Sequence, residues 1–177
     1  GFPINDYKLG RKEILDKMRK YTVAYSQKEA GFKVQTDEEI LYVDICGDVR
    51  DLIKRLSKDR VIKGENEVVL ADTPVKLMIK THQLSSGTIK FESGNSMVLC
   101  YKKARYIRHK FDGKKIAIFY KFKEELNALK EEYEDMLCET LEEFNTTNKS
   151  IALQIVSGRE GISLRKAEAL VYYNIDF

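Results

Sequence analysis

The residues best suited to chemistry form a glycine-bearing loop near the carboxyl end of the sequence. Residues 151–156 form an apolar run typical of a buried strand, followed directly by Ser157, Gly158, Arg159, Glu160 and Gly161. In an open parallel sheet, ligands bind beyond the carboxyl ends of strands. Two glycines allow close backbone approach, and amides exposed there can bind an anion. On spacing alone an ordinary strand-to-helix loop is the favoured interpretation, because such loops are common, and an anion site is the alternative.

A charge contrast is the second feature that could bind a ligand. Residues 101–123 hold nine Lys and Arg against Asp112 alone, interleaved with Tyr101, Tyr106, Phe111 and Tyr120. Residues 124–143 hold nine acidic residues against Lys130 alone. A basic, aromatic-rich block can neutralise phosphates and gain affinity from released counterions. The alternative, a solvated basic helix that faces the acidic one, is the interpretation that the charges favour without further context.

Several chemical classes find no support in the sequence. The spacing of Gly158 and Gly161 lacks the third glycine of a dinucleotide fingerprint, and no phosphate-loop pattern of the common ATPase kind occurs. His82 and His109 show no metal-ligand spacing with the cysteines, so we predict no metal site. The acidic residues 37–39 precede an apolar strand rather than follow one, which favours a strand entry over a Mg²⁺ site.

Composition limits the class of protein. The chain has 177 residues, a net charge of +3 and 43% hydrophobic residues, which suits one domain with an appended segment. No apolar run approaches the ~18 residues that a membrane-spanning helix needs. The three cysteines, Cys46, Cys100 and Cys138, are odd in number and far apart, so we expect reduced core residues in a cytoplasmic protein. Because the chain starts without Met and stops inside an apolar run, we expect a piece of a longer polypeptide.

The elements that position these residues follow from hydrophobic periodicity. Residues 1–35 read as a basic segment with a helix over 6–24, and residues 36–177 as the main domain. We predict a strand over 39–46, a helix from Asp48 to 60, an extended stretch over 67–70, a helix from Asp72-Thr73-Pro74 to 84, and a hairpin over 88–99. Further on we predict helices over 102–110 and 124–138 and buried strands over 116–120, 151–156 and 169–175. Strands alternating with helices indicate an α/β fold with a mainly parallel sheet.

Read together, these segments resemble a known family. Residues 115–122 (Lys-Ile-Ala-Ile-Phe-Tyr-Lys-Phe), followed by Glu124-Glu125-Leu126, resemble motif IV of superfamily 2 helicases of Swi/Snf type, including bacterial and phage members. Residues 141–145 resemble the stretch before motif V, with Phe144 where many members carry Trp. Residues 157–164 resemble motif V itself, with Ser163 where Asn is usual, and residues 169–177 resemble the strand leading into motif VI.

The resemblance implies the second lobe of a two-lobed motor, a RecA-like three-layer fold of the phosphate-loop NTPase type, cut before motif VI. ATP and Mg²⁺ would bind in the full-length protein, with the phosphate loop and metal ligands on the N-terminal lobe. This lobe would contact the DNA backbone without sequence preference, and alone it would hydrolyse no ATP. The resemblance assigns nucleic-acid contact to Tyr120, Lys121, Ser157, Gly158, Arg159 and Gly161, and support of the ATP site to Gly161 and Ser163.

Two other classes stay open at this point. One is a non-catalytic nucleic-acid-binding module that uses a RecA-like fold with a basic face. The other is an α/β enzyme that binds a nucleotide or a methyl donor, which the incomplete glycine pattern disfavours. The resemblance further implies the cytoplasm of a bacterial or phage-infected cell as the location, with the N-terminal lobe of the same polypeptide as a partner and no membrane.

Overall fold

The computed structural model describes residues 12–23, 29, 31, 37–156 and 162–175. Its contacts divide the chain into two units, residues 1–41 and residues 42–177. The first unit contains one described helix, α1 (Lys12–Met18), so the helix predicted over 6–24 is confirmed for those seven residues. Residues 6–11 and 24 of that prediction lie outside the described residues. Ile14 and Met18, one helical turn apart, are 54% and 50% exposed.

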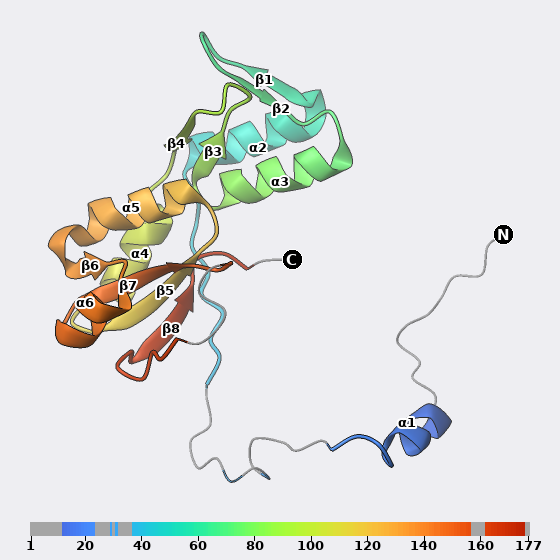
Figure 1. The fold of residues 1–177 in the computed structure, drawn as a ribbon. Helices are drawn as coiled ribbons and strands as arrows, with labels where there is room; N and C mark the ends of the chain where they lie inside the picture. The colour runs from blue at the N-terminus through green and yellow to red at the C-terminus, as the bar shows by residue number, and fades with distance from the viewer. Residues whose placement is uncertain (1–11, 24–28, 30, 32–36, 157–161, 176–177) are drawn as a thin grey trace. The chain divides into compact units, whose positions relative to one another are not determined.

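A four-stranded parallel sheet forms the centre of the second unit, which confirms the predicted α/β class (Figure 1). Its strands are β5 (Ile116–Tyr120), β6 (Leu137–Cys138), β7 (Ser150–Gln154) and β8 (Ala169–Tyr172). The order across the sheet is β6-β7-β5-β8. Ile118 pairs with Ala152 on one side and with Val171 on the other. The central strand β5 is buried over Ile116–Phe119, because its near-continuous apolar run is covered from both faces.

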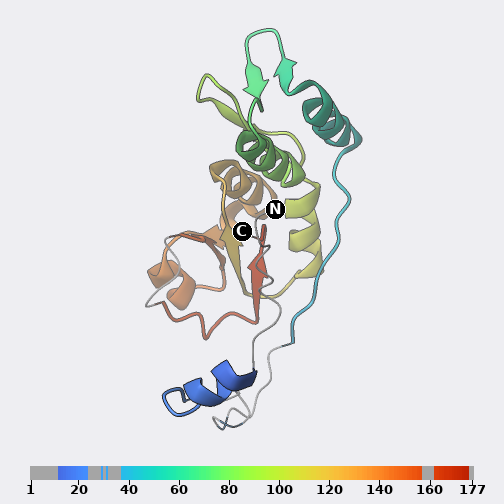
Figure 2. The same ribbon diagram turned by 90° about the vertical axis from the view of Figure 1, so that its right-hand side faces the viewer.

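Helices cover the two faces of this sheet. On one face, α4 (Lys102–Lys110) and α5 (Lys123–Tyr133) pack on Ile118 and Val171 through Ile107 and Leu129. On the other face, α6 (Leu141–Thr146) places the fully buried Phe144 against the sheet. Figure 2 shows the same layers from the side. The alternation of Ile116, Ala117 and Ile118 between the two clusters follows from the period of two along a strand.

The other elements of the second unit precede the sheet in sequence and have a core of their own. They are α2 (Gly47–Asp59), β1 (Val61–Lys63), β2 (Val68–Leu70), α3 (Pro74–Ser85), β3 (Thr88–Lys90) and β4 (Ser96–Val98). The strands form two antiparallel hairpins, β1–β2 and β3–β4. Val49 and Leu56 of α2 and Leu84 of α3 anchor the cluster. The predicted start of α3 is confirmed, because Thr73 accepts a hydrogen bond from the Lys76 amide at 3.2 Å and Pro74 follows it.

Three expectations about local structure need correction. The strand predicted over 39–46 is absent from those described residues; Tyr42 is 86% exposed and Val43 half-buried, so burial alternates, but no strand pairs with the segment. The helix α2 is capped by Cys46 rather than Asp48, which lies in the first turn. The helix predicted over 124–138 ends at Tyr133, because the Glu134 backbone (φ 49°, ψ −125°) is not helical and a short 3₁₀ turn (Glu134–Met136) leads into β6.

A disulfide bond joins Cys46 to Cys100, so the expectation of three reduced cysteines is wrong for this pair. Cys100 is buried, and Cys46 is the N-cap residue of α2. The bond spans a sequence separation of 54 residues and ties the residue before α2 to a residue two positions before α4. Spacing alone could not reveal it, since the contact depends on how α2, α3 and the β3–β4 hairpin pack. Cys138 is a free, buried thiol, as expected.

Among the glycines that the structure describes, Gly87 has the tightest surroundings, and we predict that Gly87→Ala strongly destabilises the fold. Its φ is +84°, and an added Cβ would lie 2.3 Å from the carbonyl oxygen of Cys100. Gly94 in the β3–β4 turn has φ +93° but nothing within 4 Å of an added Cβ. Gly94→Ala therefore costs only the strain of a positive φ and adds no steric clash. We expect a loss of about 1–2 kcal/mol at Gly94 and clearly more at Gly87, measured by urea denaturation. Equal losses would contradict the close approach of Gly87 to Cys100.

Reduction of the disulfide is expected to lower the free energy of unfolding by about 4 kcal/mol, from the loop-closure entropy of a cross-link this long. Thermal melts with and without dithiothreitol measure the effect. The Cys46→Ala/Cys100→Ala double variant should not respond to reductant, and Cys138→Ala should respond as the wild type does. A wild-type melting temperature unmoved by reductant would contradict the bond.

Candidate functional site

The carboxyl ends of β5, β7 and β8 meet at one edge of the sheet, where the sequence places its candidate ligand site (Figure 1). Tyr120, the last residue of β5, pairs with Gln154, the last residue of β7. The Ile155 amide donates to the Tyr120 carbonyl at 2.8 Å, and the Tyr173 amide donates to the Phe119 carbonyl at 2.9 Å. The hydrogen bonding between neighbouring strands therefore continues one residue beyond the ends of β7 and β8.

Two of the predicted contact residues lie at this edge. Tyr120 is half-buried, and burial, followed by the nearby negative charge of Glu139, raises the pKa of its phenol, which keeps the hydroxyl protonated as a donor. Lys121 follows it and is also half-buried, with its ammonium 5.6 Å from the centre of the Phe122 ring. The side-chain amide of Gln154 reaches the Lys121 carbonyl at 3.5 Å.

The other predicted contact residues, Ser157, Gly158, Arg159 and Gly161, lie outside the described residues. The structure does describe the two ends of that loop. Val156, just before it, is 70% exposed beyond the end of β7. Ser163, the predicted ATP-site residue after it, is exposed, and Leu164 packs on the Phe144 side of the sheet.

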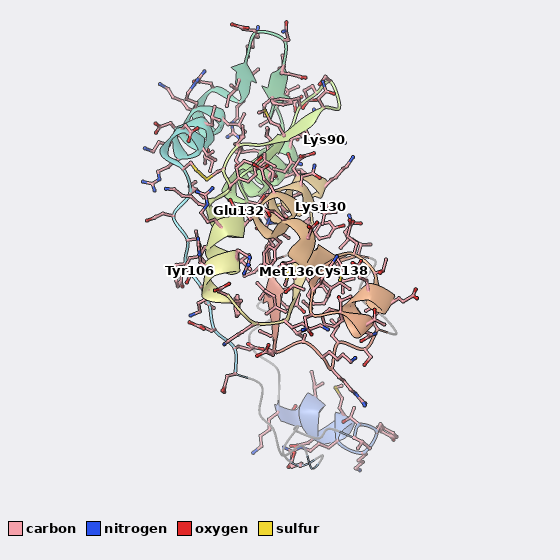
Figure 3. All side chains as sticks on the ribbon, turned by 90° about the vertical axis from the view of Figure 1, so that its left-hand side faces the viewer. Lys90, Tyr106, Lys130, Glu132, Met136 and Cys138 are labelled. Carbon is pink, nitrogen blue, oxygen red and sulfur yellow. A yellow bond between two sulfur atoms is a disulfide. The ribbon has the colours of Figure 1, made fainter. Side chains whose placement is uncertain are left out.

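Much of the basic block serves contacts within the fold. Arg105 of α4 forms an ion pair with Glu132 of α5 at 2.9 Å, and Arg108 pairs with Asp112 at 2.8 Å. The Lys115 ammonium donates to the Thr147 carbonyl at 2.6 Å and to the Phe144 carbonyl. Figure 3 labels Glu132 among the side chains of α4 and α5. For Arg105 the structure therefore fits the alternative, a basic helix that faces an acidic one. The basic residues of 101–123 do not all form one phosphate-binding face.

A buried carboxylate beside the strand ends is the feature that the sequence analysis did not single out as a site. Glu125, in the first turn of α5, is fully buried. Its Oε2 accepts from the amides of Lys121 (2.8 Å) and Phe122 (3.1 Å), and its Oε1 accepts from the side-chain amide of Asn174. The available signal was the spacing, because a Glu three residues after the residue that caps a helix can reach back to the cap.

The cluster around Glu125 extends to Lys103 of α4. The Lys103 ammonium donates to the Tyr173 carbonyl at 3.2 Å and to Oδ1 of Asn174 at 3.4 Å. Burial raises the pKa of Glu125, although the Lys121 and Phe122 amides oppose the rise. Burial lowers the pKa of Lys103, and the charge of Glu125 opposes that fall. Since Glu125 has no exposed surface, we assign it a positioning role: it fixes the turn after β5 against the residues that follow β8.

The described residues hold no group of three or more His, Cys, Asp or Glu placed to bind a metal ion. None of the described helices is long and apolar enough to cross a bilayer. Comparison of the chain with known protein families, with curated proteins and with solved structures finds no match in any of the three. Fold and site therefore define an α/β domain with a four-stranded parallel sheet, and no more specific class.

The free energy of unfolding should depend on pH through Glu125. Its folded-state pKa lies above the ordinary 4.5, so the folded state keeps a proton that the unfolded state has already lost. The stabilisation from this group is complete below pH 4.5 and declines as pH rises through the folded-state pKa, with a slope of at most about 1.4 kcal/mol per pH unit.

Glu125→Gln should remove this decline. As pH rises, the free energy of unfolding of the wild type should therefore fall relative to that of the variant. Urea denaturation over a pH series from about 4 to 8 measures it. The same exchange at exposed Glu142 is the matched control. If the free energies of unfolding of the wild type and Glu125→Gln differ by the same amount at every pH, the burial of a titrating carboxylate is contradicted.

Proposed function

We propose that residues 42–177 act as the second RecA-like lobe of an ATP-dependent helicase or translocase of Swi/Snf type. In this role the lobe binds the backbone of DNA at the carboxyl edge of its sheet. The parallel sheet suits such a lobe, and so does the order of the segments that resemble motifs IV and V. The N-terminal lobe of a longer polypeptide would be its partner.

One observation carries the proposal: Tyr120 and Gln154 are paired at the ends of adjacent parallel strands. The segment that resembles motif IV, residues 115–122, includes the first, and the segment that resembles motif V starts three residues after the second. Segments more than thirty residues apart in sequence thus emerge side by side at the edge where ligands of open α/β sheets bind.

Hydrogen bonding at this edge limits which groups can hold a phosphate. The amides of Lys121 and Phe122 already donate to Glu125, so they are engaged within the fold. Contact with a phosphate at the end of β5 therefore falls to the Lys121 ammonium and the Tyr120 hydroxyl. Glu125 supports that contact indirectly, because it holds the backbone from which both side chains project. Phosphate contacts of this kind carry no sequence information.

The nucleotide chemistry would belong to the assembled two-lobed protein. ATP with Mg²⁺ would supply the free energy for lobe closure. The resemblance places the phosphate loop and the metal ligands that would hold them on the N-terminal lobe. On this chain Ser163 presents an exposed hydroxyl after the loop, which suits support of the ATP site without metal binding. Closure of two lobes around a ligand is a common form of hinge motion.

Charge reversal tests the nucleic-acid contact. Lys121→Glu and Arg159→Glu should each weaken binding of a short DNA equally for all sequences, and each should lower the slope of log affinity against log salt by about 1. Fluorescence anisotropy over a salt series measures both quantities. Lys63→Glu makes the same charge change at an exposed position on β1 and should have little effect on the slope. Three indistinguishable variants would contradict the assignment.

ATP hydrolysis separates a motor lobe from a binding module. A longer polypeptide that includes the N-terminal lobe should hydrolyse ATP faster when DNA is added, and this chain alone should not hydrolyse it. DNA binding without any DNA-stimulated hydrolysis in the longer polypeptide would favour the non-catalytic module. Hydrolysis by this chain alone would contradict the proposal.

A further inference from the structure

The helix α3 carries apolar side chains that no described element covers. Val75, Met78 and Ile79 are 61%, 48% and 44% exposed. They lie three and four residues apart, so they share one side of the helix. The opposite side of α3 is used in the core, where Leu84 packs with α2. Figure 1 shows α3 beside α2.

A groove of about 470 Å³ runs along this helix beside these side chains, and Met78 is the one of the three that lines it. Its lining residues are Arg60, Pro74, Leu77, Met78, Thr81, His82 and Ser85. All except Arg60 come from α3 at helical spacing, so the groove follows a single helical face and is bounded on the far side by one side chain. Such a site cannot enclose a small molecule, but it can accept an elongated partner along the roughly 18 Å length of α3.

Arg60 is unusual in both backbone and side chain. It ends α2 in the left-handed region (φ 62°, ψ −2°), and its amide donates to the Leu56 carbonyl at 3.0 Å. Glycine or asparagine normally occupies such a position, because a side chain there is strained. Its guanidinium forms no ion pair with any residue that the structure describes. The strained position holds an unpaired positive charge at the rim of an apolar groove.

We propose that this groove binds an amphipathic helix of a partner protein, with a carboxylate of that helix paired to Arg60. The apolar floor around Leu77 and Met78 suits side chains spaced by three and four residues, which is how a helix seats in a groove. The Arg60 carbonyl accepts from the Ala71 amide at 2.8 Å, which places Arg60 beside the residues that lead into Pro74, so its guanidinium selects an acidic group at that end of the groove. The inference uses no residue of the carboxyl edge, so it stands independently of the proposed nucleic-acid function.

A synthetic peptide provides the test. The probe is a capped helical peptide of about 15 residues with leucines at helical spacing and one glutamate at one end. We expect saturable binding to the full chain, detected by fluorescence anisotropy, and a loss of about threefold to fivefold when that glutamate is replaced by glutamine. Arg60→Gly should weaken binding of the glutamate peptide by the same factor and leave binding of the glutamine peptide unchanged.

Two controls make the result specific. Arg60→Gly should also raise the melting temperature by about 3 °C, because glycine relieves the left-handed strain, so weaker binding could not be blamed on unfolding. Met78→Glu should weaken binding by at least about tenfold, while Met97→Glu, at a residue of similar exposure on β4, should not. No saturable binding up to about 1 mM, equal binding of the two peptides, or equal effects of Met78→Glu and Met97→Glu would overturn the inference.

Discussion

The buried carboxylate of Glu125 is the constraint on which the arrangement of the strand ends depends. A charge removed from water costs several kcal/mol unless donors replace its hydration, and the amides of Lys121 and Phe122 and the side chain of Asn174 offset part of this cost, while burial still raises the pKa of Glu125. Those donors come from the turn after β5 and from the residues after β8. Lys103 of α4 donates to Tyr173 and Asn174, so Glu125 and Lys103 together connect two strand ends and two helices.

This network sets limits on how the edge can act. Because Glu125 occupies the amides of the turn, the edge offers side chains rather than a bare amide nest at the end of β5. The basic block is likewise divided, with Arg105 and Lys115 holding elements of the fold together. Nucleic-acid affinity in the proposed role therefore depends on a few positions at the strand ends, not on the summed charge of residues 101–123.

Local sequence patterns predicted those parts of the fold that local physics decides. The apolar run of β5, the Thr73 cap of α3 and the β3–β4 turn each carry their own signal, and the structure confirms them. The strand expected over 39–46 failed because alternation of apolar residues reports burial, whereas a strand also needs a partner. The Cys46–Cys100 bond and the Asn174–Glu125 contact depend on long-range packing, which no short window of sequence contains.

In the proposed role, the carboxyl edge of the sheet binds a phosphodiester chain. Backbone amide chemical shifts during titration with a short single-stranded DNA test this binding most directly. The account predicts shifts concentrated at Tyr120, Lys121 and residues 154–163, with little change in the β1–β2 hairpin. Shifts confined to α4 or to residues 12–23, or an absence of saturable shifts at low salt, would contradict it.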